Sequence, residues 1–153
     1  MNTEPRLSSQ MEDYLEAICQ LCQEEGVARV KKIASRLDVT YPSVVGAIKS
    51  LKERNLVRQE RYGYVRLTEE GVHLAEDVIH RHEVLTSFLT NILGLDSKTA
   101  STDACRIEHA VSPETVRRFR AAAAFIESDP SIQAWKEGFR RFYRRFEVRS
   151  AQT

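Results

Sequence analysis

Residues 29–54 read RVKKIASRLDVTYPSVVGAIKSLKER, which is the pattern of two short helices joined by a tight turn. Apolar residues recur at helical spacing in two groups, predicting one helix over about residues 29–37 and another over about 42–54. Thr40 or Tyr41 would cap the second helix, and Pro42 stands in its first turn, where a missing N–H is harmless. The residues expected to face inward are Ile33, Ala34, Leu37, Val39, Val44, Ile48 and Leu51. The stretch therefore predicts a helix-turn-helix.

The segments on either side extend this motif to a winged helix. Two strand-like runs follow it, residues 56–60 and 64–67, and Arg61-Tyr62-Gly63 would form the tip of the hairpin between them. Before it, Ser9 with a glutamate three residues later has the form of a capping box, and the helix that begins there should end at Gly26. A helix-turn-helix followed at once by a charged hairpin is typical of a winged-helix DNA-binding domain, which we place at residues 1–70.

The second half of the chain predicts helices alone. The expected helices cover about residues 69–92, 97–110, 113–128 and 131–148, with Thr68, Asp96 and Ser112 as caps for the first three. The fold class is therefore mainly α with one small β-hairpin, a winged helix-turn-helix followed by a helical domain at residues 71–153.

Composition and charge limit the functions that this chain can have. It is 42% hydrophobic and 29% charged, as in soluble globular proteins, and neither a membrane span nor a signal-peptide core stands out, so we expect a cytoplasmic protein without a membrane partner. Residues 27–66 hold ten Lys or Arg and three Asp or Glu, a net charge of +7 in a chain whose total is +1. A basic block in an otherwise acidic chain favours a polyanionic partner.

Two further patterns leave alternatives open. Cys19 and Cys22 have the spacing of a redox or zinc motif, but a second such pair is missing, which favours two core residues of an amphipathic helix. The last helix combines aromatic residues at helical spacing from Trp135 to Phe146 with five arginines. Its aromatic face is expected to pack on the protein's own core or on a second subunit, the alternatives being phosphate contact and a membrane surface.

Several candidate metal ligands recur at helical spacing. Cys105, Glu108 and His109 project from one stripe of a helix, so a thiolate, a carboxylate and an imidazole could bind one ion, although chance could also produce such a cluster. His82 lies on the inward stripe of its helix, where a histidine is more often part of the core. Asp13, with Glu16 one turn later, borders the apolar stripe of the first helix, where exposed acids ordinarily interact with the helix dipole.

At these positions the chain resembles the diphtheria-toxin-repressor family of iron and manganese regulators. The resemblance rests on residues 11–16 (MEDYLE), 80–83 (HRHE) and 103–112 (DACRIEHAVS), and it covers about residues 7–128. It implies a winged-helix domain followed by a helical domain that binds metal and forms a homodimer. The metal ligands implied by motif position are Asp13, Glu16, His82, Cys105, Glu108 and His109, with Fe(II) or Mn(II) as the ion.

The chain departs from both branches of that family. The manganese branch resembles it at Asp13 and Glu16 but has Glu in place of Cys105, whereas the iron branch has the Cys but places Met at position 13. Thr86 and Ser101 stand where the iron branch has the Glu and His of an ancillary site. From this sequence we expect no counterpart of the SH3-like third domain of longer members.

These observations predict a metal-dependent transcriptional regulator, a repressor of metal uptake genes, whose dimer binds a palindromic operator in double-stranded DNA. The residues expected near DNA are Thr40, Tyr41, Pro42, Ser43, Lys49, Lys52, Arg58 and Arg61. One alternative is a winged-helix regulator of an organic ligand, although no such ligand is expected. Another is a metal-dependent hydrolase, which the lack of a separate nucleophile or general base beside the cluster disfavours, so we expect no enzyme.

Overall fold

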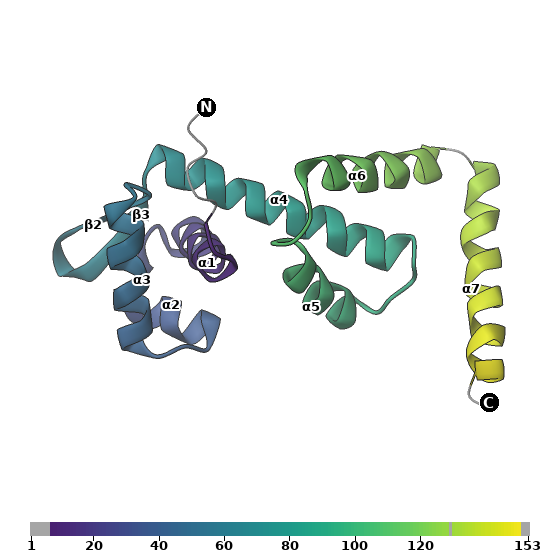
Figure 1. The fold of residues 1–153 in the computed structure, drawn as a ribbon, viewed down its shortest axis with the longest axis horizontal. Coiled ribbons are helices and arrows are strands. Elements are labelled where there is room, and N and C mark those ends of the chain that lie inside the picture. Colours follow the sequence, from purple (N-terminus) through teal and green to yellow (C-terminus); the bar gives the residue numbers. More distant parts are fainter. Residues whose placement is uncertain (1–6, 129, 151–153) are drawn as a thin grey trace. The chain divides into compact units, whose positions relative to one another are not determined.

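The computed structural model describes residues 7–128 and 130–150 (Figure 1). The chain divides into two compact units, residues 1–80 and 81–153, and the division falls inside helix α4. The elements are α1 (Ser9–Glu25), β1 (Ala28–Arg29), α2 (Val30–Leu37), α3 (Tyr41–Glu53), β2 (Val57–Gln59), β3 (Tyr64–Leu67), α4 (Glu69–Asn91), α5 (Ser97–Ile107), α6 (Pro113–Ser128) and α7 (Pro130–Ser150). Within these bounds the expected fold class is confirmed.

Helix α1 supplies the central core side chains of the first unit. Its cap is Ser8, whose hydroxyl accepts the N–H of Met11, so the expected cap at Ser9 is wrong by one residue. The helix ends at Gly26, which has a left-handed φ of 78° and donates its N–H to the carbonyl of Cys22. Leu15 and Ile18 of its apolar face are fully buried.

The helix-turn-helix is present as expected. Helix α2 ends at Asp38, which takes the left-handed conformation, and the next helix is capped by Thr40, whose hydroxyl accepts the N–H of Ser43. The expected inward residues either are buried or pack partly buried against the same core. A single apolar core therefore fixes α3 against α1 and α2, leaving the opposite face of α3 in solvent.

A three-stranded antiparallel sheet in the order β1-β3-β2 closes this unit. The hairpin of β2 and β3 was expected, and its tip is a short 3₁₀ turn at Arg61–Gly63 in which Tyr62 has a φ of 68°. Strand β1 was missed because two residues, Ala28 and Arg29, are too few to display the alternation of a strand. Ala28 is fully buried opposite Val65, so this short strand ties the wing to the end of α1.

The start of α4 is fixed to the end of α3 by two small residues. Thr68 donates its hydroxyl to the carbonyl of Asn55 at 2.8 Å and accepts the N–H of Gly71 at 3.1 Å, which makes it the expected helix cap. A Cβ on Gly71 would lie 2.0 Å from the carbonyl oxygen of Leu56. Only glycine allows that approach, so the wing and α4 are held in close contact.

The second unit consists of the rest of α4 with α5, α6 and α7. Asp96 caps α5 by accepting the N–H groups of Lys98 and Thr99, and Ser112 caps α6 by accepting the N–H of Thr115. An edge-to-face contact between the rings of Phe88 and Phe119, whose centroids are 4.7 Å apart, joins α4 to α6. Both expected caps are confirmed.

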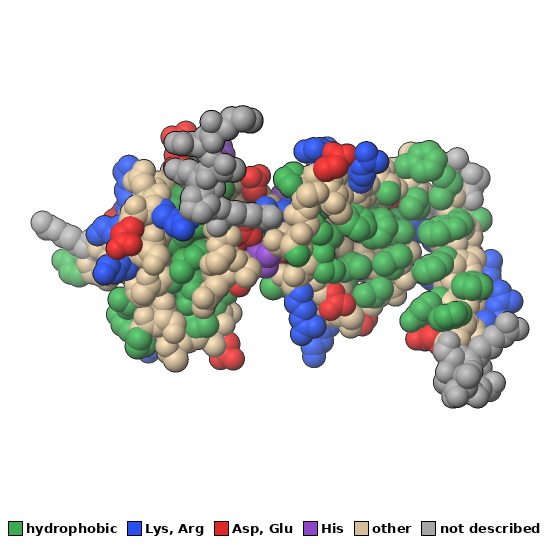
Figure 2. All heavy atoms as spheres, viewed as in Figure 1, with side chains coloured by type: hydrophobic (Ala, Val, Ile, Leu, Met, Phe, Trp, Pro, Cys, Tyr) green, Lys and Arg blue, Asp and Glu red, His purple; other side chains and the backbone are tan. Residues whose placement is uncertain are grey.

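Helix α7 does not bury its aromatic face on the rest of this chain. Trp135, Phe142 and Phe146 are each about half exposed, and Figure 2 shows hydrophobic side chains at the surface of this unit. These three side chains are thus only partly covered by the described part of the chain, and packing of this face on the protein's own core or on a second subunit stays a prediction. Across residues 7–128 and 130–150, no helix is both long and apolar enough to cross a bilayer.

Candidate metal centre and DNA-binding surface

Glu108 lies at the centre of the metal-ligand cluster and is fully buried. It follows directly after α5, which ends at Ile107, about three residues earlier than expected. The backbone of Glu108 is still helical, with φ −55° and ψ −30°, and its N–H is donated to the carbonyl of Ala104. Cys105 and Glu108 therefore keep the i, i+3 relation that places their side chains on the same side.

Two imidazoles converge on the carboxylate of Glu108. Nδ1 of His82, on α4, lies 2.7 Å from Oε2, and Nε2 of His109 lies 3.4 Å from Oε1. The other ring nitrogen of His82 lies 3.4 Å from the hydroxyl of Ser101, so the ring is oriented from both sides. His80, two residues earlier, is exposed, as its place on the helix predicted.

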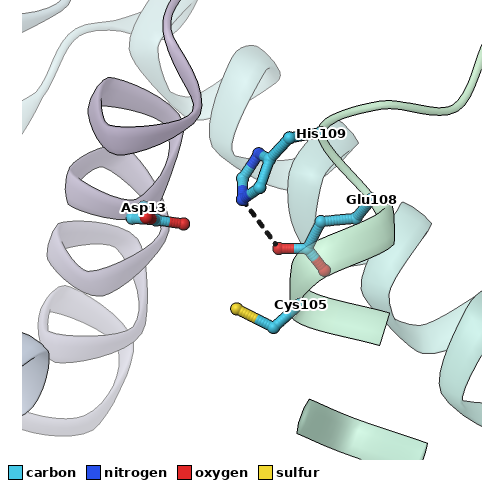
Figure 3. A group of neighbouring side chains, drawn as sticks. All are labelled: Asp13, Cys105, Glu108 and His109. Carbon is cyan, nitrogen blue, oxygen red and sulfur yellow. Dashed lines mark ion pairs between the residues drawn. The ribbon is translucent and has the colours of Figure 1, made fainter. Parts of the chain in front are cut away.

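Three of the expected ligands meet within this unit. A sulfur of Cys105, a carboxylate oxygen of Glu108 and an imidazole nitrogen of His109 all lie within 4.8 Å of one another (Figure 3). A buried carboxylate is costly unless positive charge compensates it, and the sulfur, oxygen and nitrogen donors are those that Fe(II), Co(II) and Zn(II) accept. The residues present therefore fit a divalent transition metal.

The remaining two expected ligands, Asp13 and Glu16, lie on α1 in the first unit. Both side chains are partly buried. Burial raises the pKa of the neighbouring Tyr14 hydroxyl, and the negative charge of Asp13 raises it further. The side chain of Glu16 accepts the amide of Gln20 at 3.0 Å.

Cys19 and Cys22 are core residues, as the sequence favoured. Burial raises the pKa of both thiols, and for Cys19 the nearby carboxylate of Glu76 raises it further. A thiol must lose its proton to bind a metal, and Cys22 lies 3.7 Å from the carbonyl oxygen of Val65, which can accept its S–H. Neither environment favours the thiolate that a metal or redox site requires.

The residues expected near DNA lie at the start and on the outer face of α3 and, for Arg58, on strand β2. The exposed residues of that set are Thr40, Tyr41, Pro42, Ser43, Lys49, Lys52 and Arg58. The hydroxyls of Thr40 and Ser43 are 2.8 Å apart as part of the helix cap, so their first task is to shape the start of α3. The side chain of Arg61 lies outside the described residues.

Three exposed residues of this surface escaped the sequence reasoning. Val45 and Gly46 lie on the outer face of α3, and Tyr62 at the tip of the wing is 92% exposed. A valine off the inward stripe and a glycine inside a helix were the available signals. Ser101 was also missed as a partner of His82, because the contact joins residues 19 positions apart in the sequence.

In comparisons with known proteins, both parts of the chain match domain models of one protein family. Residues 6–65 match the family model described as iron dependent repressor, N-terminal DNA binding domain. Residues 68–135 match the model described as iron dependent repressor, metal binding and dimerisation domain. The chain belongs to the iron-dependent repressor family. Members of this family are DNA-binding transcriptional regulators and not enzymes, so the hydrolase hypothesis is wrong, and the organic-ligand alternative has no support.

Relatives of this family member include sequences and solved structures. It is 35% identical over 115 residues to an uncharacterized HTH-type transcriptional regulator of Methanocaldococcus jannaschii, covering 74% of this chain and 92% of the relative. It is 35% identical over 121 residues to the HTH-type transcriptional regulator MntR of Bacillus velezensis, covering 79% of this chain and 84% of MntR.

Among solved structures, a manganese-dependent transcriptional repressor in complex with manganese matches with a TM-score of 0.68 at 32% identity, over 75% of this chain and 53% of that one. IdeR of T. acidophilum matches with a TM-score of 0.66 at 26% identity, over 76% of this chain and 54% of that one. The chain thus spans about half the length of these solved structures.

Proposed function

We propose that this chain is a homodimeric repressor that binds a palindromic operator when Fe(II) or Mn(II) occupies a site built around Glu108. The observation that carries this proposal is the convergence of His82 and His109 on a fully buried carboxylate, with the sulfur of Cys105 beside it. The helices around this donor set belong to the proposed dimerisation domain. A metal bound there could therefore influence how the dimer presents its DNA-binding domains.

Each residue has a defined task in this proposal. Glu108, His109 and Cys105 would bind the ion directly, and Ser101 would orient the ring of His82 as a further ligand. Asp13 and Glu16 of α1 complete the set that the family resemblance implies. The metal would supply positive charge to its carboxylate and thiolate ligands, and it would stabilise the DNA-binding form of the dimer by its differential affinity for that form.

The DNA-binding domain would use α3 in the major groove and the wing beside it. We keep residues 1–70 for this domain and residues 71–153 for metal binding and dimerisation. Arg61 would lie near phosphate, with Lys52 and Arg58 as further candidates, while Tyr41, Pro42, Ser43 and Lys49 would lie near bases or backbone. We expect no organic ligand, and the protein would act in the cytoplasm, where operator DNA is present.

Cys105 bears on which metal this site prefers. A thiolate favours Fe(II) over Mn(II), while the carboxylates of Asp13, Glu16 and Glu108 tolerate Mn(II). The site thus combines ligands that separate the two branches of the family, and either ion remains a candidate activator.

The test is a linkage experiment with His109→Ala. Duplexes selected from a random-sequence library by the Mn(II)-loaded protein serve as the DNA. Removing the imidazole of a direct ligand should weaken metal binding by at least about 100-fold, and DNA binding at a fixed subsaturating metal concentration should weaken with it. Metal binding is followed by anaerobic titration, and DNA binding by fluorescence anisotropy.

His80→Ala is the matched control, because His80 lies on the same helix as His82 but is exposed. This variant should match the unmodified protein in both measurements. If His109→Ala binds DNA as the unmodified protein does, with or without chelator, then metal does not control this regulator through the proposed site.

A further inference from the structure

Gly46 lies in the middle of α3, where no close contact with the described residues requires a glycine. It is exposed, its backbone is helical, and a Cβ built on it would meet no other atom within 4 Å. Alanine is a better residue in the interior of a helix, because glycine loses more conformational freedom on folding. Gly71 differs, since there a Cβ would collide with the carbonyl of Leu56. The fold requires glycine at position 71 but not at position 46.

The residues around Gly46 belong to the outward face of the same helix. Val45 is 46% exposed and Tyr41, one turn earlier, is 58% exposed, while Lys49 lies one turn later. An exposed apolar side chain beside a glycine, flanked by a cation, is unfavourable or neutral in water. A molecule that covers this face of α3 would give both features a use, because it would bury Val45 and could approach the backbone closely at Gly46.

We infer that the Val45–Gly46 step is the point where the backbone of α3 comes closest to the floor of the DNA major groove, with Val45 packed on the C5-methyl group of a thymine. The inference rests on the proposed DNA-binding function. A glycine permits close approach of the backbone, and apolar side chains contact the methyl group that thymine presents in this groove. Lys49 lies on the same face, where it can reach a phosphate and fix the register of the helix.

The first experiment compares Gly46→Ala with Gly138→Ala in the full chain. Gly138 is the matched control, because it also lies within a helix, in α7, with nothing within 4 Å of its added Cβ. Both variants should raise the Tm of the protein by about 1–4 °C. Only Gly46→Ala should weaken binding to the duplexes selected from a random library by the Mn(II)-loaded protein, by about fivefold or more, as expected for loss of a base contact.

The second experiment removes one methyl group from either side of the proposed contact. Each thymine of the selected duplex is replaced in turn by uracil, which lacks only the C5-methyl group. One replacement should weaken binding by about fourfold, the value of one buried methyl group. Val45→Thr keeps the shape of the side chain but replaces one of its two methyl groups by a hydroxyl, so it should weaken binding to the thymine duplex and reduce the sensitivity of binding to that replacement.

The outcomes separate this inference from the proposed function. If the metal-loaded unmodified protein selects no duplex, the proposed function fails. If it binds DNA and Gly46→Ala binds equally well, or if Gly138→Ala weakens binding as much, the close approach at Gly46 is wrong. A Tm lowered by Gly46→Ala would mean that the glycine serves the fold, which also overturns the inference.

Discussion

Replacing Glu108 by glutamine tests whether its buried charge serves the metal or the fold. Glutamine keeps the volume of the side chain, and its amide oxygen can still accept a hydrogen bond from His82 or His109, which lie 2.7 and 3.4 Å from the carboxylate. The substitution removes the buried negative charge of Glu108 and introduces no new charge at the site. We therefore expect the Tm of the metal-free variant to lie within a few degrees of the Tm of the metal-free unmodified protein.

The variant and the unmodified protein should differ in how much added metal raises their stability. At a free Mn(II) concentration about 100 times the Kd, binding stabilises the folded protein by about 2.7 kcal/mol. Losing a ligand should weaken binding by at least about 100-fold, since even partners of ligands are worth about 10–100-fold. At the same Mn(II) concentration the variant then gains only about 0.4 kcal/mol. The lost 2.3 kcal/mol or so corresponds to about 5–9 °C in Tm for a chain of this size.

The assay is thermal unfolding followed by circular dichroism, with and without Mn(II). Glu114→Gln is the control, because Glu114 is an exposed carboxylate paired with Arg117 and Arg118 at the start of α6. This control should keep the full metal-induced rise in Tm. A Glu108→Gln protein that keeps the full rise would refute the role of Glu108 as a ligand, and one that unfolds without metal would show that the charge serves the fold.

Three more substitutions test separate parts of the molecule. Lys49→Ala should weaken DNA binding about equally for all duplexes and reduce the dependence of log K on log salt by about one unit, measured by anisotropy across a salt series; an unchanged slope would count against a phosphate contact. Cys105→Glu should shift the ratio of the Mn(II) and Fe(II) activation midpoints toward Mn(II), measured anaerobically as DNA binding against free metal, and an unchanged ratio would mean that Cys105 does not set selectivity. Thr68→Val removes the hydroxyl that bonds Asn55 and Gly71, so it should lower the free energy of unfolding by about 2 kcal/mol in urea, while Thr68→Ser should not.

The sequence predicted most of the first unit because its signals are local. The periodicity of residues 29–54, the cap at Thr40 and the glycine at position 26 each act within one or two helical turns. Strand β1 escaped because Ala28 becomes a strand residue only through its pairing with Val65, 37 positions later. The expected cap at Ser9 failed because the neighbouring Ser8 competes for the same role and makes the bond to Met11.

For the candidate site, helical spacing alone grouped Cys105, Glu108 and His109, and the structure places their ligand atoms together. The inward position of His82 was also readable from its helix. Its two partners, Glu108 and Ser101, were not, because tertiary packing of α4 against α5 decides which side chains meet. The exposure of Val45 and Gly46 likewise depends on which face of α3 the core covers.

The chain contains one tryptophan, Trp135, and it lies on α7 stacked on Phe139 with ring centroids 5.5 Å apart. Because about half of its surface is exposed, its emission should respond to whatever covers that helix. Tryptophan emission, excited at wavelengths that the five tyrosines do not absorb, is therefore a built-in reporter of α7. A spectral shift during a titration with protein, metal or DNA would reveal whether this helix changes its surroundings, without any attached dye.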